Sequence, residues 1–90
     1  MNKYPKRKTS VSVRVLDDET VILDREEGFV HQFNQTASYV WHRLDGDLPP
    51  TTIADQLVKA FEVDLETAVR DVAKFVSHLD KLHLLEVAEG

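Results

Sequence analysis

The sequence contains no cysteine, only three glycines that stand apart, and no long apolar run, and each absence removes a class of function. Without cysteine the chain has no disulfide framework, no cysteine nucleophile and no thiolate metal site. Without clustered glycines it has no phosphate-binding loop. No apolar run approaches the roughly 18 residues of a transmembrane span, and no apolar segment of a secretory signal follows the basic start. These absences predict a reducing, cytoplasmic compartment.

Size and net charge narrow the function further. The chain has 90 residues and a mass of 10.3 kDa, which corresponds to one small domain. Its formal net charge is −5, and an acidic surface argues against nucleic acids and anionic membranes as partners. A chain of this size is too small for most enzymes and is typical of a module that acts together with other proteins.

The charge is unevenly distributed along the chain. Residues 1–10 contain four basic side chains and no acidic one, a local charge of +4. The other eighty residues contain 7 basic and 16 acidic side chains, a net charge of −9. We predict a flexible basic arm over residues 1–10 and a single domain over residues 11–87. The arm is either simply solvated or contacts an acidic partner.

Hydrophobic residues alternate in three short runs, over residues 11–16, 20–23 and 29–33. The runs are rich in β-branched and aromatic residues, and polar turns separate them. This pattern predicts three short strands in an antiparallel meander. A sheet of such short strands needs a helical layer over one face.

The third run ends the predicted meander and therefore offers an unpaired edge. Because side chains alternate along a strand, Phe29, His31 and Phe33 face one side, while Val30 and Gln32 face the other. An exposed edge of this kind is a common site of β-augmentation, in which an extended peptide adds as a further strand.

From Asn34 onward the hydrophobic residues recur every three to four positions, which predicts three helices. Asn34 and Asp64 are suitable N-caps for the first and third helices, and Thr52 with Asp55 resembles a capping box for the second. The predicted order is β-β-β-α-α-α. This is an α+β fold, and the short connection between the last two helices makes it winged-helix-like.

The last helix carries two apolar rows. The first row is typical of a helix side that packs on the core. Its members are Leu65, Ala68, Val72, Phe75, Leu79 and Leu82. The second row, Val69, Ala73 and Val76, is either additional core or the lining of a peptide pocket.

No combination of side chains supports catalysis or metal binding. The four histidines are His31, His42, His78 and His83, and the last two lie about 140° apart on a helix. Zinc ligands on one helix share a face, so we predict no metal ion, no cofactor and no enzymatic activity.

Two functions remain open, DNA binding and peptide recognition. The paired helices resemble a helix-turn-helix, but the polar residues of the last helix comprise three of each sign and give no basic surface. We therefore favour peptide recognition and keep a winged-helix DNA-binding or transcription-regulatory domain as the alternative.

Several motifs follow one another along the chain. They are Leu23-Asp24, Gly28, Phe33-Asn34-Gln35-Thr36-Ala37 with Trp41, Leu44-Asp45-Gly46, Ile53 with Leu57, Asp71-Val72 with Phe75-Val76, and Leu82-His83-Leu84-Leu85. In this order and spacing, over about residues 11–86, they resemble the PqqD-like family, the coenzyme PQQ synthesis protein D or RiPP recognition element.

The resemblance implies a peptide chaperone for ribosomally made, post-translationally modified peptides (RiPPs). In this family the leader segment of a precursor adds to the third strand, lies against the third helix and is delivered to a modifying enzyme. That enzyme is a radical S-adenosylmethionine enzyme in PQQ biosynthesis or a leader peptidase in lasso-peptide systems. We therefore expect a precursor peptide and such an enzyme as partners, and a chain that is a monomer or a weak homodimer.

The resemblance also implies where a leader peptide binds. The docking edge comprises Phe29, Val30, His31, Gln32 and Phe33. The groove residues are Val69, Ala73 and Val76, with Arg70 and Lys74 as cations for acidic leader side chains. The sequence departs from the family pattern in this strand, because Val30 and His31 replace a frequent tyrosine or tryptophan and Phe33 replaces a leucine.

Asn34 and Trp41 lie within these motifs, but structural roles explain both. An asparagine at a strand-to-helix junction acts as an N-cap, and its loss costs about 1 kcal/mol. A tryptophan on the apolar side of a helix is an anchor of the core.

Overall fold

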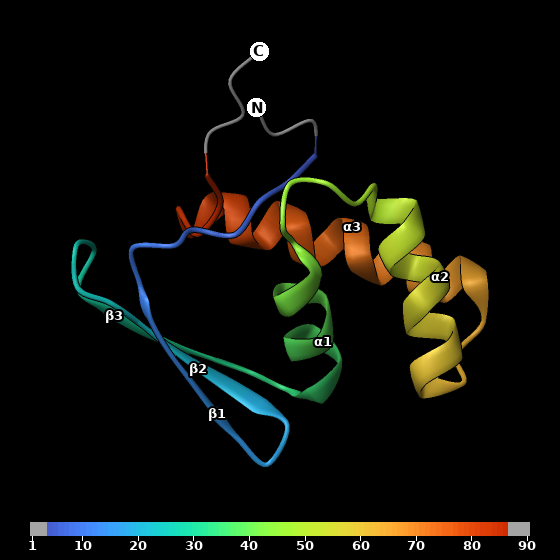
Figure 1. Ribbon diagram of the computed structural model, residues 1–90, viewed down its shortest axis with the longest axis horizontal. Coiled ribbons are helices and arrows are strands. Elements are labelled where there is room, and N and C mark those ends of the chain that lie inside the picture. Colours follow the sequence, from blue (N-terminus) through green and yellow to red (C-terminus); the bar gives the residue numbers. More distant parts are fainter. Residues whose placement is uncertain (1–3, 87–90) are drawn as a thin grey trace.

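The computed structural model describes residues 4–86, which form a three-stranded antiparallel sheet followed by three helices (Figure 1). The strands are β1 (Ser12–Leu16), β2 (Glu19–Asp24) and β3 (Phe29–Phe33). The helices are α1 (Gln35–Arg43), α2 (Pro50–Phe61) and α3 (Leu65–Lys81). The predicted α+β fold and its element order are confirmed.

The first hairpin sets the hydrogen-bonding pattern of the sheet. Its loop consists of Asp17 and Asp18, whose φ angles of 50° and 67° are those of a type I′ turn. Such a turn bonds the C=O before it to the N–H after it, so Leu16 and Glu19 are a hydrogen-bonded pair. Hydrogen-bonded and non-hydrogen-bonded pairs alternate along an antiparallel ladder. The direction of each backbone group in β2 and β3 follows.

β2 and α1 form the centre of the core. Thr20, Ile22 and Asp24 alternate with half-buried residues along β2 and are fully buried. Trp41 on α1 is also completely buried, with its ring centroid 5.7 Å from that of Phe33. Burial of a large apolar side chain contributes about 1.5–3 kcal/mol, so Trp41 is a major anchor of the core.

α3 packs on this core along the first of its two predicted rows. Ala68, Val72 and Leu79 are buried, whereas Phe75 and Leu82 are half-buried beside the core cluster. In Figure 1, α1 lies between the sheet and α3, and α2 packs against α3 at the end away from the sheet. This arrangement leaves one side of α3 turned toward β3.

Side chains cap two of the three helices as predicted, but the second helix begins differently. Asn34 Oδ1 accepts a hydrogen bond from Ala37 N (2.9 Å), and Asp64 Oδ2 accepts one from Thr67 N (3.1 Å). The predicted capping box at Thr52 is wrong, because α2 begins at Pro50 and its N-cap makes no side-chain hydrogen bond. Proline has the φ of a first helical residue and no N–H to satisfy, so it starts the helix earlier.

The N-terminal segment is attached to the domain, which differs from the flexible arm expected over residues 1–10. Arg7 N donates a hydrogen bond to the C=O of Leu44, and Lys8 N donates one to the C=O of Leu84 (both 2.8 Å). Glu86 N in turn donates to the C=O of Lys6. These partners are distant in sequence, so no local sequence pattern predicts the hydrogen bonds. Residues 1–3 and Val87, the predicted end of the domain, lie outside the described residues.

Candidate functional site

β3 is an edge strand, and within residues 4–86 no other strand pairs with its outer backbone groups. The ladder alternates from the Leu16–Glu19 pair, so Thr20, Ile22 and Asp24 direct their N–H and C=O groups toward β3. In β3, the residues opposite them bond back to β2. Val30 and Gln32 therefore direct their N–H and C=O groups away from the sheet, at the open edge.

The side chains of β3 divide between two faces as the alternation predicts. Phe29, His31 and Phe33 lie opposite the buried residues of β2 and face the helical layer. Val30, which is 67% exposed, and Gln32 lie on the outer face of the sheet. Phe33 is buried and meets Phe75 of α3 edge-on, with 5.0 Å between the ring centroids. This aromatic contact joins β3 to α3.

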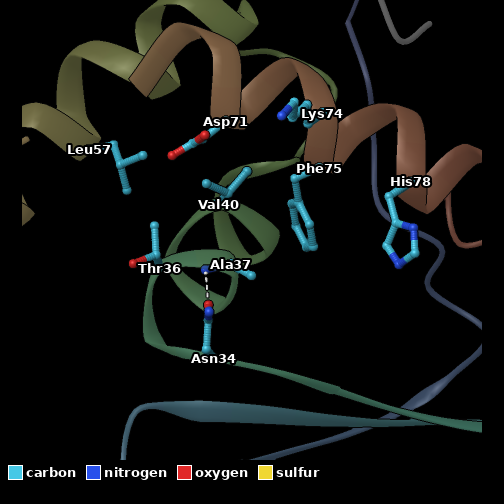
Figure 2. Close-up of a pocket in the computed structure, with 9 residues that line it drawn as sticks. All are labelled: Asn34, Thr36, Ala37, Val40, Leu57, Asp71, Lys74, Phe75 and His78. Carbon is cyan, nitrogen blue, oxygen red and sulfur yellow. Dashed lines mark hydrogen bonds between the residues drawn. The ribbon is translucent and has the colours of Figure 1, made fainter. Parts of the chain in front are cut away.

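One pocket of about 440 Å³ opens between the start of α1 and the middle of α3 (Figure 2). Its apolar residues are Ala37, Val40, Leu57 and Phe75. Its polar residues are Asn34, Thr36, Asp71, Lys74 and His78. Figure 2 shows Phe75 and His78 projecting from α3 toward the strands. The pocket thus has an apolar interior and a charged rim, which is typical of a site for a side chain of a peptide.

A second pocket, of about 270 Å³, lies between the beginning of β3 and the end of α3. It is lined by Glu27, Phe29, His31, Lys81, Leu82 and His83. α3 therefore borders both pockets, while β3 lines the second pocket and reaches the first only through the contact of Phe33 with Phe75. Phe33 and Phe75 mark one end of this region, and Phe29 and Leu82 mark the other. We call the two pockets together the β3–α3 groove.

Of the five α3 residues expected in a groove, only Lys74 lines either pocket. At about 100° per residue, Val69, Ala73 and Val76 lie some 100–160° around α3 from Phe75, in the direction opposite to Lys74. Val69 is 41% exposed, and Val76 packs against the core cluster. The structure thus brings Lys74 to β3 and places these three residues elsewhere.

Arg70 stands one helical turn before Lys74 on the same side of α3, although it lines neither pocket. With Lys81 it extends a row of cations along the groove side of the helix. His78 lies between Lys74 and Lys81 and faces the first pocket. Asp71 lies on the same side of α3, so the three cations outnumber one acidic residue here, in a chain whose net charge is −5.

Four groove residues of α3 were not expected there from the sequence, namely Asp71, Phe75, His78 and Lys81. Phe75 has the spacing of a core residue and is partly buried against the core cluster. The sequence pattern therefore does not show that part of its ring is exposed to a pocket. His78 and Lys81 are polar residues on an amphipathic helix, a pattern shared by most solvent-exposed positions. The angular positions of His78 and Lys81 on α3 identify them as groove residues only when the side of α3 that faces β3 is known.

A further pocket of about 390 Å³ lies on the other side of α1, beside the first hairpin, where Val15, Tyr39, Arg43 and Phe61 contribute to its wall. His42, also in this wall, lies with Nε2 3.2 Å from the Thr20 hydroxyl. Burial, together with nearby arginine side chains, lowers the pKa of His42. This pocket does not adjoin β3.

Residues 4–86 contain no group of three or more histidine or acidic side chains placed to hold a metal ion. Over the same residues, every helix is too short or too polar to cross a membrane.

Comparison with known proteins was made by sequence and by structure. The family model described as coenzyme PQQ synthesis protein D (PqqD) matches residues 19–85. A search of curated proteins by sequence gave no match.

Three solved structures resemble the chain. TbiB1 in complex with the TbiA(beta) leader peptide is 28% identical, with a TM-score of 0.81 over 94% of this chain and 99% of that one. Lasso peptide synthetase B1 complexed with the leader peptide is 29% identical, with a TM-score of 0.80 over 92% and 98%. A PqqD truncation of Methylobacterium extorquens PqqCD, described as a functional stand-alone RiPP recognition element, is 21% identical, with a TM-score of 0.74 over 92% and 88%.

Proposed function

The chain belongs to the coenzyme PQQ synthesis protein D (PqqD) family, and from this we propose that it binds the leader segment of a ribosomally made precursor peptide and presents it to a modifying enzyme. Two similar structures are complexes with leader peptides, and each aligns with more than nine-tenths of this chain. A recognition domain of this kind acts by binding, and we assign no catalytic role to any residue.

The unpaired edge of β3 beside the groove is the observation that carries the proposal. Val30 and Gln32 offer N–H and C=O groups with the spacing of a strand, which an extended leader can pair with. Alternate side chains of the leader then point toward the groove and toward solvent. Each backbone hydrogen bond contributes only about 0.5–1.5 kcal/mol, so specificity must come from the pockets.

Electrostatics favours an acidic leader. Arg70, Lys74 and Lys81 lie along the groove side of α3, and a leader carboxylate beside them gains attraction and faster association. We propose residues 29–33 of β3 as the docking edge, the same residues that the sequence analysis assigned to it. Participation of Val69, Ala73 and Val76 stays a prediction, and the groove geometry gives it no support.

The enzyme that receives the peptide belongs to one of the classes that the family serves, a radical S-adenosylmethionine enzyme or a leader peptidase. Because the precursor is made on ribosomes, we place the complex in the cytoplasm. The acidic chain then acts as a carrier between two proteins.

Titration of the labelled domain with the leader peptide encoded nearest its gene tests the proposal. We expect amide shifts at Val30, Gln32 and the groove side of α3. Val30→Pro removes one edge donor and should lower leader affinity about tenfold. Val13→Pro is the matched control, because Val13 presents its N–H at the opposite edge of the sheet, on β1. Equal loss in both variants, or binding to duplex DNA without any leader binding, would contradict the proposal.

A further inference from the structure

In the middle of the β3–α3 groove, the strand and the helix each carry a histidine. At one end of the groove, Phe33 of β3 contacts Phe75 of α3, and at the other end, Phe29 and Leu82 share the second pocket. The strand and the helix therefore run past each other in opposite directions. His31 is the midpoint of Phe29–Phe33, and His78 is one helical turn beyond Phe75, so both lie between the two ends.

His31 has an unmet hydrogen-bonding capacity. Its Nε2 is buried and has no hydrogen-bond partner, although the side chain forms part of the wall of the second pocket. A buried polar atom without a partner costs about 1–3 kcal/mol, and such atoms mark places where a partner can be gained. Rotation about the Cβ–Cγ bond changes which ring nitrogen faces the groove.

The register of the sheet determines which leader residue meets His31. Residues directly opposite each other on paired strands share a face, so leader residues opposite Phe29, His31 and Phe33 point into the groove. The backbone of His31 bonds to β2, so its leader partner is in a non-hydrogen-bonded pair, where opposing side chains are closest. The two outer positions lie beside apolar pockets, and the middle position lies beside imidazoles.

The side chains nearest the middle position favour an anion. Lys74 and Lys81 flank His78 on α3, one on either side. The acidic residues of the groove lie in its two outer parts, with Asp71 in the first pocket and Glu27 in the second. Each pocket thus pairs one lysine with one acidic residue, and a leader carboxylate at the middle position has the imidazoles of His31 and His78 as its nearest hydrogen-bond donors.

We propose that the groove selects a leader segment with an acidic residue opposite His31, whose carboxylate bonds His31 and His78, between apolar residues two positions to either side. This inference rests on the proposed function and adds a recognition pattern, apolar–x–acidic–x–apolar, in the five residues that lie along β3. His31 and His78 are the specificity-determining residues. Neither backbone pairing nor the apolar pockets alone would distinguish glutamate from glutamine at the middle position.

Selection from a displayed library tests the pattern even before the natural leader is identified. The library holds extended peptides with five randomised central positions, and the full chain is the immobilised protein. We expect enrichment of aspartate or glutamate at one position, with apolar residues two positions before and after it. Enriched peptides that lack the acid overturn the inference and leave the proposed function standing. Failure to enrich any peptide overturns both.

A double-mutant cycle then measures the contact. With a selected peptide, glutamate-to-glutamine substitution at the middle position should reduce affinity for the unaltered chain about tenfold, a usual value for a charge-assisted hydrogen bond. The same peptide change should have little effect on the chain with His31→Phe and His78→Ala. His42→Gln is the control, because His42 lies in the pocket on the other side of α1. An undiminished effect in the double variant overturns the assignment of these two histidines.

Discussion

Lys8 Nζ lies 3.3 Å from Oδ2 of Asp24, whose side chain is fully buried. The other oxygen of Asp24 accepts hydrogen bonds from the backbone N–H groups of Glu26 and Glu27. One carboxylate therefore holds the turn between β2 and β3 and connects it to the N-terminal segment. Since Phe29 follows this turn and lines the second pocket, the contact also fixes one end of the groove.

Stability should decrease in acid because of Asp24 and Asp64. Burial raises the pKa of Asp24, but hydrogen bonds from the Glu27 and Glu26 amides and the Lys8 ammonium outweigh it and hold the pKa below its ordinary value of 3.8. Hydrogen bonds from Thr67 similarly lower the pKa of Asp64. The unfolded chain then binds more protons, so stability is complete above the ordinary pKa and is lost as the pH falls through the folded values.

Urea denaturation at a series of pH values from 7 to below about 4 measures this loss. Asp24→Asn should lower stability at neutral pH and flatten the acid decrease. Asp55→Asn, at an exposed position on α2, is the control and should leave the profile unchanged. The same acid decrease in Asp24→Asn as in the unaltered chain would mean that this carboxylate is not responsible.

Replacement of the cap of α1 should reduce stability by a modest, specific amount. Asn34→Ala removes the acceptor of the Ala37 amide and should lower the free energy of unfolding by about 1 kcal/mol. Asn34→Ser keeps a capping oxygen and should lose much less. Chemical denaturation of both variants, analysed with one common m-value, measures the two losses of stability. Equal losses in Asn34→Ala and Asn34→Ser would exclude capping as the cause.

Phe75 should contribute more to leader binding than its partial burial suggests. Phe75→Leu reduces the apolar surface of the first pocket and the edge-on contact with Phe33, and leader affinity should fall about tenfold. Phe61→Leu is a matched control, because Phe61 meets Tyr39 edge-on at 5.3 Å in the pocket away from β3. Calorimetric titration of both variants with the leader should show the loss only in Phe75→Leu.

Charge reversal on the groove side of α3 should slow association with an acidic leader. Lys74→Glu places an anion on the rim of the first pocket, while Lys59→Glu makes the same change of net charge on an exposed part of α2. The association rate should decrease mainly for Lys74→Glu, and added salt should reduce the difference. Stopped-flow measurements at two ionic strengths test this, and similar rates for both variants would argue against local attraction.

The parts of the fold that depend on neighbours in sequence could be predicted. Asn34 and Asp64 cap helices through amides three residues away, and the alternation of Phe29–Phe33 is enough to assign both faces of β3. The start of α2 was misplaced because two signals compete within a few residues. Pro50 begins the helix before Thr52 can cap it.

The helix side of the groove could not be predicted, because it depends on how α3 turns toward β3. Val69, Ala73 and Val76 are apolar at helical spacing, yet the rotation set by Ala68, Val72 and Leu79 in the core moves them away from the strand. The same rotation brings His78 to the groove. The N-terminal segment illustrates the same limit, since Arg7 bonds to residues that are 35 positions or more away.

The backbone pairing of Lys6 and Lys8 with Glu86 and Leu84 has a consequence for joining the domain to another protein by engineering. The pairing is antiparallel, so the chain enters and leaves the domain side by side, at the spacing of neighbouring strands, about 5 Å. A unit with adjacent ends can be spliced into a surface loop of a host protein without stretching the host. A leader-binding module could therefore be transplanted into an unrelated enzyme as a single closed insertion, with the β3 edge still free to receive peptide.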